Sequence, residues 1–195
     1  METDLPQKIR TFVGIFPPLA VAEKLKEVEN VLQKDLLNGA VGWTRVEQIH
    51  LTLNFLGNIP SARLLEFETV LAEVRVPAFS LRCQGLGCFP NSRKPTVLWA
   101  GLTGELEPLR QLKSLLDKAL EKLGIVPEER PFHPHLTLGR VKQLHSKERQ
   151  NIAALLKESE SQLFGEWCAE RIDFMRSTLS SAGSNYSVLK SFPLH

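Results

Sequence analysis

The chain has 195 residues, of which 43% are hydrophobic and 24% are charged, and its formal net charge is +2. These values are typical of one globular domain, or of one domain with two closely packed lobes. The small net charge excludes the strong basic field of a protein that binds long nucleic acids regardless of sequence, so any contact with nucleic acid has to be local.

Hydrophobic periodicity predicts alternating strands and helices in the first half of the chain. A β-favouring run that ends at Pro17 predicts a strand, and apolar residues at helical spacing predict a helix after it. The next alternating run closes at Gly57 and Asn58, which predicts a strand followed by a turn. The expected segments are a strand at 11–16, a helix at 18–36, a strand at 50–56 and a helix from 60.

The second half of the chain continues this alternation. Gly124 marks the end of a strongly amphipathic helix, and Ser146 is expected to cap the next helix. A Ser-rich turn at 180–184 separates the last two strands. The expected segments are strands at 79–85 and 96–102 with a loop at 87–95, a helix at 104–123, a strand at 135–141, a helix at 146–160, and strands at 167–176 and 185–191.

Several of these strands are separated only by short turns, which permit antiparallel pairing alone. The predicted fold class is therefore α+β. No long linker, low-complexity tract or charge block divides the chain, so we expect residues 1–195 to form a single domain.

Cysteine usage and the N-terminal sequence indicate a cellular compartment. Cys83, Cys88 and Cys168 are an odd number without C-x-x-C spacing, which favours neither a disulfide framework nor a structural zinc site. The first ten residues have no apolar stretch behind their charges, and no window approaches the ~20 apolar residues of a membrane span. We expect a cytoplasmic protein with reduced cysteines and no membrane contact.

One tetrapeptide, H-L-T-L, occurs twice, at residues 50–53 and 135–138. Each copy begins a predicted strand, follows a turn-like stretch and precedes a predicted helix. The rest of the two halves is not visibly similar. The matching context nevertheless indicates an internal duplication with one motif in each half.

Strand geometry explains the pattern within the motif. Side chains two residues apart share a face, so His50 lies with Thr52, His135 lies with Thr137, and the leucines point to the opposite face. The leucine faces can be buried against the amphipathic helices. If a pseudo-two-fold axis relates the halves, the two polar faces can meet across a cleft.

Two imidazoles and two hydroxyls that face one pocket suit phosphoryl transfer without a metal. With an ordinary pKa of about 6.5, one histidine can be neutral and act as a base while the other is protonated and acts as an acid. Threonine hydroxyls can donate to the phosphoryl oxygens as charge develops. Opening a cyclic phosphate requires deprotonation of a water and protonation of a ribose oxygen, and such a pair supplies both.

A metal site is the alternative interpretation of the same histidines. His133 and His135 would lie on one strand face, with His50 as a third ligand. This interpretation leaves both threonines without a role, and Pro134 constrains the start of the strand. A lone histidine on a strand is usually structural, but two identical motifs favour catalysis, so we expect no metal and no other cofactor.

The motifs and their flanks resemble those of the two-histidine phosphoesterase superfamily, and within it the bacterial and archaeal RNA 2′,3′-cyclic phosphodiesterases, also called 2′-5′ RNA ligases. The resemblance covers most of the chain. It implies a bilobal fold with a pseudo-two-fold axis, in which two antiparallel sheets face each other across a central cleft with helices outside. The matching segments are 10–17 (RTFVGIFP), 41–57 (VGWTRVEQIHLTLNFLG) and 132–140 (FHPHLTLGR).

The resemblance also implies an activity and residue roles. The expected reaction is hydrolysis of a terminal RNA 2′,3′-cyclic phosphate, such as that of a tRNA fragment, to a 2′-phosphomonoester without a metal or nucleotide cofactor. His50 matches the proton donor, His135 the proton acceptor, and Thr52 and Thr137 the phosphate-binding positions. We expect the enzyme to be a monomer.

Five flanking residues are further candidates for contact with the substrate. Arg140 matches a basic position common after the second motif, but strict alternation puts it on the leucine face unless the strand ends or twists there. Trp43, Phe16 and Phe132 either stack on a base at the cleft rim or belong to the core. His133 is not typical of the family and could add a proton or phosphate contact.

Three other functions stay open from the sequence. The same site could join RNA ends through a 2′-5′ linkage, or it could hydrolyse a small cyclic nucleotide. The chain could also be a non-catalytic module that binds RNA ends. The intact pairs of His and Thr argue against the last function, because binding alone needs no acid and base.

Overall fold

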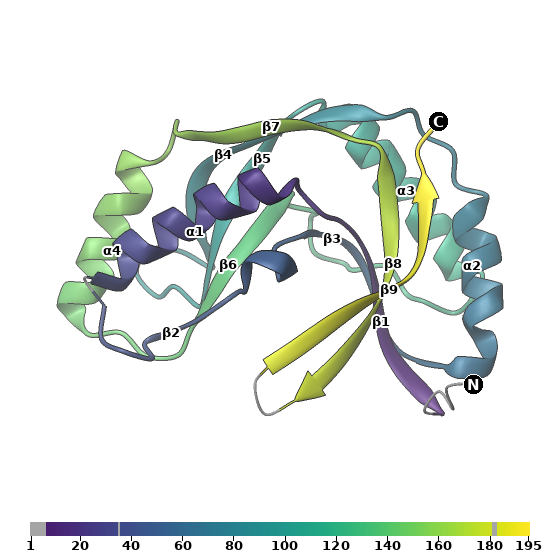
Figure 1. The fold of residues 1–195 in the computed structure, drawn as a ribbon, viewed down its shortest axis with the longest axis horizontal. Helices are drawn as coiled ribbons and strands as arrows, with labels where there is room; N and C mark the ends of the chain where they lie inside the picture. Colours follow the sequence, from purple (N-terminus) through teal and green to yellow (C-terminus); the bar gives the residue numbers. More distant parts are fainter. Residues whose placement is uncertain (1–6, 35, 181–182) are drawn as a thin grey trace.

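The computed structural model describes residues 7–34, 36–180 and 183–195. Within them, the predicted α+β class is confirmed: strands and helices are mixed, and the helices lie outside the sheet (Figure 1). The strands are β1 (Lys8–Ile15), β2 (Val41–Trp43), β3 (Leu51–Pro60), β4 (Phe79–Phe89), β5 (Val97–Gly104), β6 (His135–Val141), β7 (Leu163–Ala169), β8 (Arg171–Ser180) and β9 (Gly183–Pro193). The helices are α1 (Leu19–Lys34), α2 (Leu64–Ala72), α3 (Leu106–Glu121) and α4 (Ser146–Glu158), with short 3₁₀ helices η1 (Val46–Gln48) and η2 (Ser61–Arg63).

The described strands form one antiparallel sheet in the order β7-β4-β5-β6-β3-β1-β8-β9, and β2 also pairs with β6. Its two halves meet where β3 pairs with β6, and there the register consists of the single pair Leu51–Leu136. The two sheets implied by the resemblance are therefore two halves of one hydrogen-bonded sheet. The pair that joins them lies inside the two H-L-T-L motifs.

A strand–helix–strand–helix unit occurs twice, as β1-α1-β3-α2 (with β2 inserted) and as β5-α3-β6-α4. In the sheet β3 and β6 lie at the centre and β1 and β5 flank them, so an approximate two-fold axis passes between Leu51 and Leu136.

The first helix of each unit crosses to the other half of the sheet. Helix α1 contacts β7 and α3 contacts β3, whereas α2 contacts β9 and α4 contacts β4 within their own halves. In Figure 1, α2 and α3 therefore lie together on one side of the molecule, and α1 and α4 lie on the opposite side. We infer from these crossings that the two halves form one domain rather than two. None of the helices within the described residues is long and apolar enough to cross a membrane.

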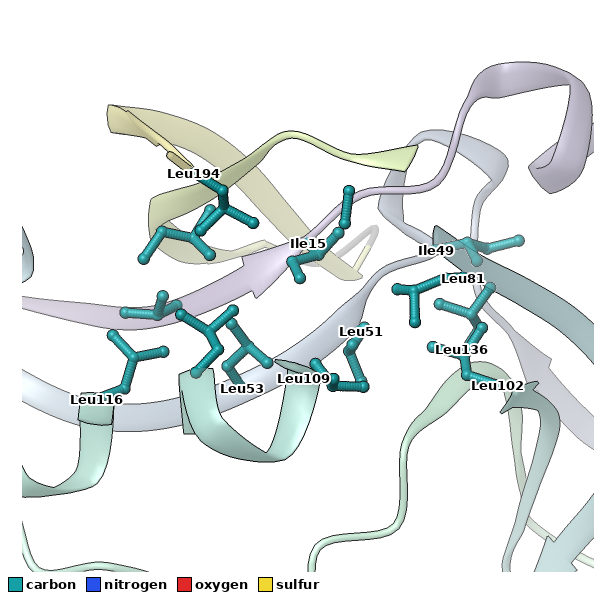
Figure 2. Packing of buried hydrophobic residues seen from close by; sticks show 14 of the residues in the cluster. Ile15, Ile49, Leu51, Leu53, Leu81, Leu102, Leu109, Leu116, Leu136 and Leu194 are labelled. Carbon is teal, nitrogen blue, oxygen red and sulfur yellow. The ribbon is translucent and has the colours of Figure 1, made fainter. Parts of the chain in front are cut away.

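The leucines of both motifs lie in the hydrophobic core. Leu51, Leu53, Leu136 and Leu138 are each at most 3% exposed. Figure 2 shows Leu51 and Leu53 beside Leu109 and Leu116 of α3, and Leu136 grouped with Leu81 and Leu102. Burial of one such side chain contributes about 1.5–3 kcal/mol, so these strands are anchored from the face opposite to their histidines.

The predicted turn at residues 57–58 is wrong, because β3 continues to Pro60. Gly57 has a φ of +70° and pairs with Thr11, while the next pair joins Phe55 and Phe12 and leaves Leu56 unpaired. Glycine with positive φ is typical of a β-bulge as well as of a turn, and here it marks a bulge.

The predicted single strand at 167–176 is divided at Glu170. Residues before it, in β7, pair with β4 at one end of the sheet, and residues after it, in β8, pair with β1 and β9 in the other half. The buried positions change phase at the division: Trp167 and Ala169 are buried before it, and Ile172 and Phe174 are buried after it.

Smaller differences concern the ends of elements. The segment after Pro60 begins as η2 before α2, and β4 extends through the predicted loop start to Phe89. His145, not Ser146, occupies the cap position of α4, where its backbone N–H donates to the Glu148 carboxylate at 2.7 Å. The predicted Ser-rich turn at 180–184 includes residues 181 and 182, which lie outside the described residues.

Candidate active site

His50 and His135 are neighbours at the centre of the sheet. They immediately precede Leu51 and Leu136, and the antiparallel register of that pair sets His50 opposite Thr137 and Thr52 opposite His135. The four polar side chains share the face opposite to the buried leucines. Two motifs that are far apart in the sequence thus form one polar cluster on the two-fold axis.

Both imidazoles are held in the same way. Nδ1 of His50 lies 2.6 Å from the carbonyl oxygen of Gln48, and Nδ1 of His135 lies 2.6 Å from the carbonyl oxygen of His133. A carbonyl oxygen only accepts, so each Nδ1 carries a proton and donates it. Each Nε2 is then the nitrogen available for proton transfer, and Nε2 of His50 lies 3.0 Å from Oγ1 of Thr52.

Aromatic rings surround His50 on several sides. Phe12 and Phe16 stack on its imidazole at 4.7 and 5.2 Å between ring centroids, and Tyr186 approaches edge-on at 5.3 Å. Burial lowers the pKa of His50 below its ordinary value, the bond to Gln48 opposes that change, and the charge of His135 lowers the pKa further. The neutral imidazole is therefore favoured in the unliganded protein.

His135 has a different environment. Phe89 meets its ring edge-on at 5.0 Å, and Trp99 lies 6.2 Å away. Burial again lowers the pKa, and the bond to the carbonyl oxygen of His133 opposes it. The positive charges of His133 and Arg140 lower the pKa of His135 further, so this imidazole is also favoured as neutral.

Three side chains of this cluster, those of His50, Thr52 and Thr137, line a hollow of about 330 Å³, and His135 lies outside that lining. Both halves of the sheet contribute to its walls, together with Gln48 of η1, and no carboxylate of the described residues lines it. A hollow with arginine, histidine and hydroxyl groups and no acidic side chain suits an anion. Its side chains include Arg10, Phe12, Gln48, His50, Thr52, Phe55, Thr137, Arg140, Ser177 and Tyr186.

The last leucine of each motif forms a β-bulge. The pairing of β3 with β1 skips Leu53, and the pairing of β6 with β5 skips Leu138. An extra residue shifts the alternation by one, so the side chains five positions after each histidine, Phe55 and Arg140, face the hollow. This bulge is the distortion that Arg140 needs to reach the cleft.

The β8–β9 hairpin is tied to the segment that precedes His50. The side-chain amide of Gln48 donates to the carbonyl oxygen of Ser184, and Arg45 donates to the same oxygen at 2.7 Å and to Oδ1 of Asn185 at 2.5 Å. Gln48 therefore connects the hairpin to the imidazole that its own carbonyl oxygen holds. No local pattern in the sequence pointed to Gln48 or to Tyr186, because their partners are distant in the chain.

The remaining sequence candidates lie in different places. Trp43 and Phe132 are partly buried against the core and do not line the hollow, so the core alternative fits both of them. Trp43 packs against Gly139, where a Cβ would come within 3.0 Å of it, and Phe132 lies beneath Nζ of Lys113. The side chain of His133 is exposed, while its carbonyl oxygen holds His135.

The described residues contain no group of three or more His, Cys, Asp or Glu side chains that could hold a metal ion. The ligand set of His50, His133 and His135 considered from the sequence is therefore not assembled. The hydrogen bonds at both Nδ1 atoms instead give these two histidines a common orientation.

A family model, the LigT-like phosphoesterase, matches the chain twice, over residues 15–99 and 102–186. Each match contains one H-L-T-L motif. The two matches contain the helix–strand–helix parts of the duplicated unit, α1-β3-α2 and α3-β6-α4.

Proteins similar to this chain extend over almost its full length. The RNA 2′,3′-cyclic phosphodiesterase of Aquifex aeolicus is 32% identical over 95% of this chain and 97% of its own, and that of Archaeoglobus fulgidus is 32% identical over 94% and 99%. Among solved structures, TT0787 of Thermus thermophilus has a TM-score of 0.78 and 30% identity, covering 95% of this chain and 98% of its own. E. coli LigT in complex with 3′-AMP has a TM-score of 0.76 at 23% identity, covering 96% and 98%, which shows the shared fold.

Proposed function

The chain belongs to the LigT-like phosphoesterase family, and we propose that it hydrolyses terminal 2′,3′-cyclic phosphates of RNA to 2′-phosphomonoesters. One observation carries the proposal. Two imidazoles meet across a single strand pair, and each is tethered through Nδ1 to a backbone carbonyl oxygen. A bound phosphate between them would have one Nε2 on either side.

In this mechanism His135 is the base and His50 is the acid. Nε2 of His135 takes a proton from a water, whose oxygen attacks the phosphorus atom. The bond from phosphorus to O3′ breaks as Nε2–H of His50 protonates O3′, and the phosphate stays on O2′. The reaction consumes one water, and a proton exchange between the two imidazoles and solvent restores their starting states.

Three side chains can stabilise the charge that develops on the phosphoryl oxygens. The hydroxyls of Thr52 and Thr137 line the same hollow as His50 and can donate hydrogen bonds. Arg140 adds a positive charge on the side of His135. Donors that are already in position need no reorganisation during the reaction.

The lowered pKa values suit the base better than the acid. His135 must be neutral to accept a proton, and its surroundings favour that form. His50 must be protonated to donate, and in the unliganded protein burial works against that form. The single negative charge of a bound cyclic phosphate favours the charged imidazole, so we expect substrate binding to raise the pKa of His50.

Product analysis tests the proposal. The substrate is an oligoribonucleotide with a 2′,3′-cyclic phosphate end, in excess over enzyme and in the presence of EDTA. We expect many turnovers to a product whose terminal phosphate is on O2′ and is removed by a phosphatase, at a rate that EDTA does not change.

Each other outcome contradicts a part of the proposal. A joined product with a 2′-5′ linkage would assign the site to ligation, and binding without turnover would assign the chain to RNA-end binding. Loss of activity in EDTA that a divalent metal restores would replace the acid–base pair with a metal site.

A further inference from the structure

A second hollow, of about 520 Å³, lies along β1, β3 and β8. Arg10 and Ser177 line both hollows, so the second hollow is adjacent to the candidate active site. Nothing in the proposed reaction uses the second hollow, because both imidazoles and Arg140 lie outside it.

Strand β1 carries a row of side chains from His50 into this second hollow. Phe12, Arg10 and Lys8 are two residues apart, so they lie on one face of the strand at intervals of roughly 6.5 Å. Phe12 stacks on His50, Arg10 lines both hollows, and Lys8 lines the second hollow alone. The row therefore leads away from the reacting centre through two successive cations.

The charged side chains that line the second hollow are all basic. Among the residues that the structure describes, Lys8, Arg10 and Arg176 line it, and no carboxylate does. Within the described residues, neither Lys8 nor Arg10 forms an ion pair. The whole chain has 24 basic and 22 acidic residues, so this local excess of unpaired positive charge favours an anionic ligand.

Uncharged polar groups flank Arg10. Asn58 of β3 and Ser177 of β8 are the cross-strand partners of Arg10, and their amide and hydroxyl groups can bond to a ribose hydroxyl or a phosphate oxygen. Leu179, also in the lining, is 70% exposed and offers an apolar surface for a base. Cations, hydrogen-bonding groups and an apolar surface together match a single-stranded nucleic acid.

We propose that the second hollow binds the nucleotides on the 5′ side of the terminal nucleotide, with Arg10 at the first phosphodiester and Lys8 at the next. The inference rests on the proposed function, since His50 protonates O3′ only if the terminal ribose lies on the β1–β3 side of the site. The 5′ oxygen of that ribose connects to the preceding nucleotide. The row of side chains on β1 continues in the same half of the sheet, where that nucleotide would lie.

The test compares two substrates with the same 3′ nucleoside: the nucleoside 2′,3′-cyclic phosphate and a trinucleotide that ends in it. Steady-state kcat/KM is measured from about 50 to about 200 mM salt for the wild type, Lys8→Gln and Lys24→Gln. Lys24 is an exposed lysine on α1, away from both hollows, and serves as the matched control.

We expect Lys8→Gln to lower kcat/KM several-fold on the trinucleotide and to leave it unchanged on the nucleoside substrate. The slope of log kcat/KM against log salt for the trinucleotide should become shallower by about 0.7, as for the loss of one contact to a single-strand phosphate. Lys24→Gln should match the wild type. Equal behaviour of the two lysine variants on the trinucleotide would overturn the proposal.

A binding measurement separates this inference from the proposed function. Fluorescence anisotropy of a labelled trinucleotide with a 2′-phosphate end requires no turnover. If the wild type hydrolysed neither substrate, the proposed function would be wrong, and weaker binding by Lys8→Gln than by Lys24→Gln would still support the second hollow. Equal affinities would exclude it.

Discussion

The two H-L-T-L motifs share a backbone but have different surroundings. In both, Nδ1 donates to the carbonyl oxygen two residues earlier and the last leucine forms a bulge. His50, however, is enclosed by Phe12, Phe16 and Tyr186, whereas His135 lies near Arg140 and an exposed His133. The duplicated backbone thus sets where the imidazoles point, and residues outside the motifs set how they differ.

The two motifs also differ in the side chain that follows each bulge. Phe55 follows His50 by five residues, Arg140 follows His135 by five, and both line the hollow. An aromatic ring suits contact with a nucleoside, and a cation suits contact with a phosphate. The difference agrees with a terminal nucleoside on the side of His50 and phosphoryl charge on the side of His135.

The largest expected effect comes from removing either imidazole. We expect His50→Gln and His135→Gln each to lower kcat by about 10²–10⁴-fold, because each loses one proton transfer. The double variant should be little worse than either single variant, since the pair acts as a unit. His195→Gln, at an exposed histidine, is the control. A near-normal rate in either variant, with an unchanged circular dichroism spectrum, would remove that residue from the mechanism.

Replacing Arg140 should show a further functional difference between the two motifs. We expect Arg140→Gln to lower kcat by about 10²-fold through loss of a charge on the phosphoryl oxygens. The charge of Arg140 lowers the pKa of His135, so the variant should have a higher pKa there and an acid limb of the pH–rate profile at higher pH. Arg93→Gln, in an exposed loop, should change neither quantity. A loss of rate without that shift would place Arg140 away from His135 in solution.

Replacing Phe55 should affect binding rather than chemistry. Phe55 is 57% exposed, so Phe55→Ala removes little buried surface. Loss of one base-stacking ring corresponds to roughly a tenfold rise in KM, with kcat unchanged. Leu65→Ala, at an exposed leucine of α2, is the matched control. A fall in kcat at constant KM would contradict the assignment of Phe55 to the nucleoside.

The pH dependence gives the smallest but most specific difference. One neutral and one protonated histidine should give a bell-shaped profile, whose limbs belong to the pair. Because the pKa of each free histidine is lowered, the acid limb of kcat/KM should lie below the ordinary value of 6.5. Bound phosphate raises the pKa of the donor, so the alkaline limb of kcat should lie at higher pH than that of kcat/KM. A profile with one ionisation would contradict the division of roles, and coincident limbs would contradict the effect of phosphate.

Much of the fold and the centre of the site could be predicted from local pattern. Alternation within the motifs assigned Leu51 and Leu136 to the buried face, and both are at most 1% exposed. The repetition of H-L-T-L singled out His50 and His135, which the structure brings together. Such predictions succeed because the face on which a strand residue lies depends only on its own position in the strand.

The tertiary structure alone decided which strands pair and where an extra residue is accommodated. The bulges at Leu53 and Leu138 turn Phe55 and Arg140 into the hollow, and the division at Glu170 sends one extended run into both halves of the sheet. Tyr186 reaches His50 only through the β8–β9 hairpin. Register, bulges and such ring contacts depend on partners distant in the chain, so a pattern read along a single segment does not contain them.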